Sequence, residues 1–388
     1  MPFALFLIPL YICIISPIAL QYKMNKEKIK ILFVTTWFPH EENKHKGIFI
    51  LEHARAVAST GIEVRVLFIN IIHSKSLFHY KYDEYHEHNI KIYKKEIKSI
   101  FWKFLYIIPY LWQRLGLSAF NKKIINEFKP DIIHSHVSFP ALIIGDFIAK
   151  KNNIPQVLSE HWSGLENHLK KNIFSYITKN AYTRVSSIIV VSEFLKNNIE
   201  KLIPNKNIQI IPNVVSEDFC FTRHGTDDNA YRFTCIANWQ APKRLDLIIE
   251  SLNKFSEDNK TNIILNVIGI GSQQEFYESK IFNPLIKIKY QGRKTKKEIQ
   301  DIFQQTDFFI HASDYETFSI VIAEALQNGI PILASNKAAI PELINSNSGI
   351  LADNTIEDFI KKTGYLLQQK WNREEIASFY NQKFKSSD

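Results

Sequence analysis

The sequence predicts an α/β protein built from two domains, each with a parallel sheet. Residues 306–335 read as a strand, a polar turn, a helix that ends at Gly329 and Pro331, and a second strand. Residues 29–68 repeat this order, and their first strand is the nearly continuous apolar run expected of a strand buried on both faces. The length of 388 residues and the apolar content of 45% suffice for two hydrophobic cores.

Composition narrows the class of protein. Cys13, Cys220 and Cys235 are scattered, which indicates neither a disulfide framework nor a metal knuckle and fits a reducing cytoplasm. The net charge of +9 is moderate for this length. It favours an anionic membrane surface or anionic ligands, although lysines often serve only to solvate a face. We expect no nucleic-acid partner.

Residues 1–23 form an apolar N-terminal segment. Its uncharged part is long enough to cross a bilayer, but Pro2, Pro9 and Pro17 interrupt it and no signal-peptide pattern is present. Met24 reads as a natural start. Two interpretations stay open, a membrane anchor and a mis-assigned upstream start.

The first domain begins with the strand at residues 29–35. A loop over residues 37–47, a helix from about residue 48 to residue 60 and a strand at residues 63–68 follow. Ligands of open α/β sheets bind at the carboxyl ends of strands, so Gly47 in this loop is a candidate binding residue. A plain turn glycine is the alternative.

Residues 75–115 mix lysines with aromatic side chains. The aromatic residues include Phe101, Trp102, Phe104, Tyr106, Tyr110 and Trp112. Such a segment can lie at a membrane interface, with its rings at the level of the lipid headgroups and its lysines on phosphates. The alternative is that these rings belong to the core or to a lid.

Two further predicted strands bring four polar side chains toward one edge of the sheet. His134 and His136 come from residues 130–136, and Glu160 and His161 end residues 156–161. A metal site and an acid/base or hydrogen-bonding group are both compatible with these residues. Against a metal, Glu160 and His161 point to opposite faces of their strand and no cysteine is near.

The rest of the chain continues the alternation of strands and helices. Strands are predicted at residues 187–192, 208–213, 233–238, 265–269 and 290–293, and helices from residue 193, after residue 243, at residues 294–305 and at residues 359–369. Ser192 is a suitable cap for the helix that starts at Glu193.

A polar run at residues 223–229 interrupts this pattern, so we place a linker at residues 216–230. The linker separates a first domain, residues 24–215, from a second domain, residues 231–370. Residues 371–388 read as the start of a C-terminal helical segment whose early end suggests truncation.

The second domain carries the other candidate binding residues. Lys243 lies near a helix start, where a cation can meet a diphosphate, although a solvated lysine is the alternative. Gly269 and Gly271 form a Gly-x-Gly turn, which is a weak signal by itself.

The turn within residues 306–335 carries the strongest signal. Phe318 and Ser319 are predicted to lie in the first turn of the helix with Thr317, so their N–H groups point outward and suit a phosphate. Glu316 just outside this helix and Glu324 two turns inside can accept hydrogen bonds from sugar or ribose hydroxyls. The alternative is that both glutamates only favour a helix N-terminus and its solvated face.

This turn also carries a resemblance. Glu316 and Glu324 stand in the frame E-T-F-S-I-V-I-A-E-A-L-x-x-G-x-P, followed by Pro341 and Glu342. The frame resembles the paired-glutamate signature of the family 4 glycosyltransferases. The resemblance implies the GT-B fold, with two Rossmann-like domains facing a central cleft. It implies a nucleotide-diphosphate sugar as donor, held by the second domain, and an acceptor held by the first. It also implies transfer with retention of configuration and no metal or other cofactor, in agreement with the lack of an Asp-x-Asp motif.

The resemblance implies a role for each candidate residue. Glu316 contacts hydroxyls of the transferred sugar, Glu324 holds the ribose, and His161 and Gly47 line the reaction centre. Lys243 and the amides of Phe318 and Ser319 hold the diphosphate, with Arg244 as a substitute for an arginine that Asn238 replaces. The remaining donor-binding residues are Gly269, Gly271, Gly292 and Arg293, which lie beside the nucleotide. Val214 departs from the family, which has a glycine there.

The implied function is a hexosyltransferase-type enzyme of surface polysaccharide synthesis with a glycan or lipid-linked acceptor. The resemblance places it in the cytoplasm at the inner face of the cytoplasmic membrane. Three alternatives remain: a nucleotide-sugar epimerase of the same fold, a catalytically silent membrane-associated scaffold, and a dinucleotide-binding oxidoreductase. The last lacks the Gly-x-Gly-x-x-Gly turn that cradles a pyrophosphate.

Overall fold

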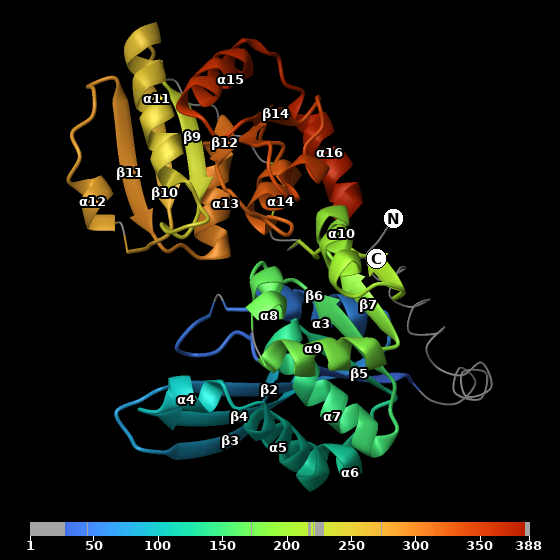
Figure 1. Cartoon of the computed structure of the whole chain (residues 1–388). Helices are drawn as coiled ribbons and strands as arrows, with labels where there is room; N and C mark the ends of the chain where they lie inside the picture. The colour runs from blue at the N-terminus through green and yellow to red at the C-terminus, as the bar shows by residue number, and fades with distance from the viewer. Residues whose placement is uncertain are drawn as a thin grey trace. The chain divides into compact units, whose positions relative to one another are not determined.

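The computed structural model describes residues 28–384 except residues 45, 172, 216–218, 220, 222–228 and 273. The apolar segment at residues 1–23, most of the expected linker and residues 385–388 therefore lie outside the described residues. The chain divides into two compact units between Val214 and Val215. Both units are α/β with parallel sheets, which confirms the predicted fold class (Figure 1).

The first unit is built on an eight-stranded sheet with the order β3-β4-β2-β1-β5-β6-β7-β8. All neighbouring strands are parallel except β3 and β4. The strands are β1 (Lys30–Thr35), β2 (Glu63–His73), β3 (His79–Glu87), β4 (Ile90–Ser99), β5 (Ile132–His136), β6 (Gln156–Glu160), β7 (Ser187–Val190) and β8 (Ile208–Ile210). The helices are α3 (Ile48–Ser59), α4 (Trp102–Tyr106), α5 (Pro109–Ala119), η1 (Phe120–Ile124), α6 (Ile125–Glu127), η2 (Ser138–Leu142), α7 (Ile143–Asn152), α8 (Leu165–Lys171), α9 (Ile173–Arg184) and α10 (Glu193–Leu202).

Hydrophobic clusters cover both faces of this sheet. Side chains alternate along β1, so Ile31 and Phe33 pack with α3 on one face, while Leu32 and Val34 pack with α5 and α7 on the other. Burial on both faces explains why the strand reads as a continuous apolar run.

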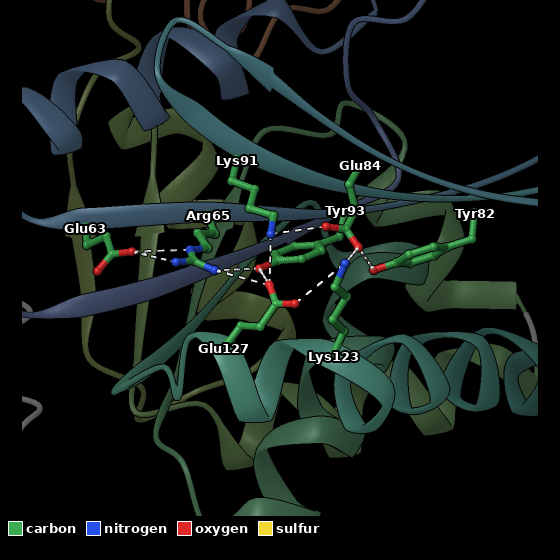
Figure 2. A network of polar contacts seen from close by, with 8 residues as sticks. All are labelled: Glu63, Arg65, Tyr82, Glu84, Lys91, Tyr93, Lys123 and Glu127. Carbon is green, nitrogen blue, oxygen red and sulfur yellow. Dashed lines mark hydrogen bonds and ion pairs between the residues drawn. The ribbon is translucent and has the colours of Figure 1, made fainter.

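The lysine- and aromatic-rich stretch begins with an antiparallel hairpin, β3–β4, that its sequence pattern does not reveal. Charged contacts tie the hairpin to α6, as Figure 2 shows. Lys91 Nζ lies 2.8 Å from Glu127 Oε2 and 3.1 Å from Glu84 Oε2, and Lys123 contacts both glutamates. Because these side chains are partly exposed, each pair stabilises the fold only slightly. The parallel pairing of β4 with β2 joins the hairpin to the rest of the sheet.

The second unit is built on a six-stranded, fully parallel sheet with the order β11-β10-β9-β12-β13-β14. The strands are β9 (Tyr231–Ile236), β10 (Ile263–Ile268), β11 (Ile286–Gly292), β12 (Phe308–His311), β13 (Ile332–Ser335) and β14 (Gly349–Ala352). The helices are α11 (Leu245–Asn259), α12 (Gln274–Glu278), α13 (Lys296–Gln304), α14 (Ile320–Gln327), η3 (Ile340–Glu342), α15 (Ile356–Gln368) and α16 (Arg373–Phe384).

The core of the second unit joins α11 and α15 to the sheet. Ile248 and Leu252 of α11 share one cluster with Phe233 of β9 and Val267 of β10, and α16 packs beside α14 (Figure 1). Among the helices within residues 28–384 that the structure describes, none has both the length and the apolar character needed to cross a membrane.

Candidate active site

Two loops of the second unit meet where neighbouring strands β9 and β12 end. The Asp314 N–H donates to the Pro242 carbonyl at 2.9 Å, and the Arg244 N–H donates to the Ala312 carbonyl at 3.0 Å. Lys243 and Ser313 form an isolated antiparallel bridge. Because these loops follow adjacent parallel strands, the fold brings together residues that are far apart in the sequence.

The bridge places Lys243 against Glu316. The Lys243 ammonium contacts Glu316 Oε1, and His311 Nε2 lies 2.8 Å from the same oxygen. Burial alone raises the pKa of the Glu316 carboxyl, but Lys243 and His311 outweigh it and lower this pKa to about 2. Glu316 is therefore a carboxylate at neutral pH. Of its two partners, the sequence interpretation includes Lys243 and misses His311. A histidine as the last residue of an apolar strand is the sequence feature that could have indicated a site residue.

Helix α14 begins at Ile320, three residues later than the sequence predicts. Ser319 is its N-cap residue and has a left-handed backbone with φ of 77°. Because this conformation is not that of a right-handed helix, the helix cannot include Ser319 or earlier residues. In the described part of the chain, no hydrogen bond uses the N–H groups of Phe318 or Ser319, and the buried Ser319 hydroxyl has no partner. The corrected helix start thus still leaves these donors at the positive end of α14.

The second glutamate of the frame, Glu324, is the fifth residue of α14. Its side chain is buried, with a relative exposure of 9%. Phe318 is also buried, and its ring packs edge-on against Phe384 of α16 at 5.8 Å between centroids. Glu316 and Glu324 are both largely withdrawn from water. This argues against the alternative that they only form a solvated helix face.

Arg244 is already neutralised within the second unit. Its guanidinium donates to both carboxylate oxygens of Asp246 at 2.8–3.0 Å and lies 3.8 Å from Asp314. These acidic partners weaken Arg244 as a replacement for the arginine that Asn238 displaces. Asn238 itself is exposed, two residues after the end of β9.

The Gly-x-Gly turn is explained by close packing of the protein backbone. A Cβ on Gly269, which has φ of 126°, would lie 1.9 Å from the Ala237 carbonyl oxygen, and one on Gly271 would lie 2.6 Å from the Trp239 carbonyl oxygen. Only glycine allows this approach. Gly292 also has a positive φ, with open space beside it, and Arg293 is exposed.

In the first unit, Gly47 starts α3 with a left-handed backbone. A Cβ on Gly47 would lie 2.3 Å from the Trp37 carbonyl oxygen, so the loop over residues 37–47 requires glycine. Two residues later, the ring of Phe49 lies 4.6 Å from the ring of His161. The structure thus brings the Gly47 loop and His161 to one end of the sheet.

The histidines of the first unit form a buried cluster. The rings of His134 and His136 are 4.3 Å apart, and His161 stacks on His136 at 5.9 Å. A fourth member, His53 of α3, lies 5.0 Å from His136. The sequence interpretation misses His53, because it sits within the apolar period of a helix. Burial lowers the pKa of His134 and of His161 to about 3, and that of His53 and His136 well below the ordinary range.

Glu160 does not join this cluster but holds the turn that carries His161. Its carboxylate accepts hydrogen bonds from the backbone N–H groups of His161 at 2.9 Å, Trp162 at 2.8 Å and Ser138 at 3.0 Å, and from the Tyr182 hydroxyl at 2.7 Å. Burial is the largest influence on Glu160 and raises its pKa. The residue is therefore a positioning group for His161.

Known proteins resemble this chain along most of its length. The profile of the family described as Glycosyltransferase Family 4 matches residues 47–219, and that described as Glycosyl transferases group 1 matches residues 216–383. An uncharacterized glycosyltransferase of Methanocaldococcus jannaschii is 26% identical over 293 residues, which are 72% of this chain and 76% of that protein. An uncharacterized 41.2 kDa protein in the cps region of Klebsiella pneumoniae is 24% identical over 289 residues, which are 69% of this chain and 78% of that protein.

Among solved structures, an Anabaena protein in complex with UDP and glucose has a TM-score of 0.66 at 13% identity, covering 93% of this chain and 96% of that one. This structure and similar ones have the GT-B glycosyltransferase fold, and the two α/β units of this chain have the same fold. The chain belongs to the family 4 glycosyltransferases and is a transferase enzyme.

Proposed function

We propose that this enzyme transfers a sugar from a nucleoside-diphosphate sugar, with retention of configuration, to a glycan or lipid-linked acceptor in surface polysaccharide synthesis. The second unit holds the donor and the first unit holds the acceptor. In the reaction, the bond between the anomeric carbon and the diphosphate oxygen breaks, and the acceptor oxygen bonds to that carbon. The proton of the acceptor hydroxyl ends on the released diphosphate.

The observation that carries the proposal is the group of Lys243, Glu316 and the free donors at the start of α14. Lys243, whose ammonium has donors besides the one that contacts Glu316, and the N–H groups of Phe318 and Ser319 supply hydrogen bonds for the diphosphate as it leaves. Glu316, kept ionised by its partners, accepts hydrogen bonds from hydroxyls of the transferred sugar. Glu324 accepts those of the ribose. The solved Anabaena complex, whose ligands are UDP and glucose, supports a donor of this class.

The first unit contributes His161 and Gly47 to the reaction centre. His161 is kept neutral by burial, so its ring can donate or accept one hydrogen bond to a sugar hydroxyl. Gly47 has no side chain, which lets the loop over residues 37–47 fold back against the Trp37 backbone, and we assign it the role of shaping this loop at the reaction centre. No metal takes part in the proposed transfer.

Binding of nucleotides tests the donor site directly. With protein starting at Met24, one family of nucleoside diphosphates should raise the melting temperature, because a ligand that binds only the folded state stabilises it. The shift should persist in EDTA. Lys243→Met should reduce affinity for the diphosphate about tenfold or more by removing a charge from the phosphates.

Lys287→Met is the matched control, because Lys287 is an exposed lysine on β11 and its loss changes the net charge equally. Equal nucleotide affinity in the two variants would contradict the assignment of Lys243. A melting temperature that no nucleotide raises would favour the scaffold, and conversion of a donor sugar in the absence of acceptor would favour the epimerase.

The acceptor side of the proposal includes contact with an anionic membrane. Near the start of α4, Phe101 and Phe104 are 56% and 64% exposed, and Tyr110 of α5 is 62% exposed. The nearby Leu77 and Phe78 are 70% and 59% exposed, and the Leu77 carbonyl accepts a hydrogen bond from Ser99 at 2.5 Å. The lysine- and aromatic-rich stretch therefore divides, with Trp112 in the core and this aromatic patch on the surface.

Exposed cations lie on the same stretch as the aromatic patch. They are Lys75, Lys103 and Arg114. Aromatic rings at headgroup level combined with cations on lipid phosphates suit the surface of an anionic bilayer. A lipid-linked acceptor would then be reached from the membrane surface.

Vesicle binding tests this patch. We expect the double change Phe101→Ser and Phe104→Ser to lower partition onto vesicles containing an anionic phospholipid about tenfold, because two rings leave the interface. The control is Phe276→Ser with Phe379→Ser, two rings that are 56% and 50% exposed in the second unit. Cosedimentation with vesicles measures both, and equal partition of the two double variants would contradict the patch.

A further inference from the structure

We propose that His53, His136 and His161 form a binding site for a first-row transition-metal ion of the Zn²⁺ type within the first unit. The proposed transfer itself uses no metal, although this site shares His161 with the proposed reaction centre.

The three side chains converge from different elements. His53 lies on α3, His136 ends β5, and His161 follows directly after β6. One ring nitrogen from each comes within 4.8 Å of the others. Zn–N bonds of about 2.0–2.1 Å in a tetrahedral site place such donors about 3.4 Å apart. Small side-chain rotations therefore close the site, with the backbone of all three elements left in place.

The second observation is the state of His136. Its side chain is fully buried, and neither ring nitrogen has a hydrogen-bond partner in the described part of the chain. Leaving a buried polar group without a partner costs about 1–3 kcal/mol, so such a group calls for an explanation. A bound cation supplies one, because a ring nitrogen that coordinates a metal is satisfied.

The surroundings hold the three rings near these positions. The rings of His134 and Phe33 pack against His136 at 4.3 and 4.4 Å, and His134 is itself engaged by Ser159 at 2.8 Å. The Glu160 carboxylate fixes the backbone at His161. Three imidazoles leave a fourth position on the ion open, as in zinc sites that bind water or another small ligand. His161 is partly exposed as a residue, but both of its ring nitrogens are buried, so the ion would be enclosed by the protein.

Occupation of this site has a consequence that rests on the proposed function. An ion that takes a ring nitrogen of His161 removes it from the sugar, so Zn²⁺ inhibits transfer while EDTA restores it. The transition-metal ion is thus an inhibitor of the enzyme rather than its cofactor.

Metal binding is tested without reference to activity. Titration of the full chain, freed of metal, with Co²⁺ should give the visible absorption of a tetrahedral complex at one ion per chain, and Zn²⁺ should displace it. His136→Phe and His53→Phe, which keep an aromatic ring in the cluster, should each weaken binding at least tenfold. His79→Asn removes an exposed histidine of β3 and should leave binding unchanged.

Melting curves establish that each variant is folded. An apo protein that takes up no ion, or equal affinity in wild type and in folded His136→Phe, would overturn the site. Loss of binding in His79→Asn would also overturn it, because the ion would then lie on surface histidines. Inhibition by Zn²⁺ is measured separately. If the ion binds but no transfer is found with any donor, the metal site stands and the proposed function fails.

Discussion

Replacing Glu316 by glutamine should reduce sugar transfer by about 10²–10³-fold, the range found when a group that stabilises the transition state is removed. Glutamine retains the size of the side chain and can still accept a hydrogen bond from His311, so the packing of the loop is kept. What is lost is the negative charge beside Lys243 and the strong hydrogen bonds to sugar hydroxyls. Initial rates with saturating donor measure the effect.

Glu357→Gln provides the control, because this exposed glutamate in the first turn of α15 carries the same charge and lies in the same unit. A Glu316→Gln enzyme as active as this control would refute the role of Glu316. Glu316→Ala is expected to reduce transfer as strongly. It leaves Lys243 and His311 without their acceptor, so glutamine is the cleaner substitution.

The stability that Glu316 gives the wild-type protein should depend on pH in a defined direction. The pKa of Glu316 is lowered to about 2 in the folded state from an ordinary value of 4.5. The ionised carboxylate therefore stabilises the fold fully above about pH 4.5 and progressively less as the pH falls toward 2. The difference in melting temperature between wild type and Glu316→Gln should accordingly shrink over this acidic range.

Replacing Glu160 by alanine should destabilise the first unit by about 3 kcal/mol or more. The change leaves three backbone N–H groups and the Tyr182 hydroxyl without their acceptor, in a place where water does not replace it. The midpoint of urea unfolding, followed by circular dichroism, measures the loss. Transfer should fall as well, because the turn that carries His161 is no longer held.

The matched change is Glu200→Ala, which removes an exposed carboxylate from α10 of the same unit. Surface substitutions of this kind usually change stability by no more than about 0.5 kcal/mol. If Glu160→Ala unfolds at the same urea concentration as Glu200→Ala, the hydrogen bonds of Glu160 contribute no stability, and the positioning role assigned to Glu160 is refuted.

The sequence predicts elements best where one local pattern decides the structure. The strand at residues 30–35 and the helix that Gly329 ends are recognised, because burial on both faces and a left-handed glycine leave plain signals. The β3–β4 hairpin is missed because its strands are rich in charged and aromatic residues, which alternate weakly. Its ion pairs to α6 join residues that are distant in sequence, so they give no local signal.

The candidate site is predictable to the extent that its residues share a local frame. Glu316 and Glu324 lie in one such frame, and Lys243 opens another. His311 and His53 are not recognised, because their partners come from a loop or from other strands, and only the three-dimensional fold joins them. The predicted start of α14 is wrong because Ser319 has a left-handed backbone although it is not a glycine, so the sequence does not indicate this conformation.

The order of strands in the second unit has a consequence for how the enzyme is made. β9, the first strand of this unit to be synthesised, takes a central place between β10 and β12, and the contact of Lys243 with Glu316 joins residues 73 positions apart. Contacts of such high sequence separation form late, because a long loop must close before they are gained. On the ribosome, therefore, β9 stays without one of its neighbours until β12 emerges. The donor-binding loops acquire their arrangement only after β12 and the turn that carries Glu316 have been translated.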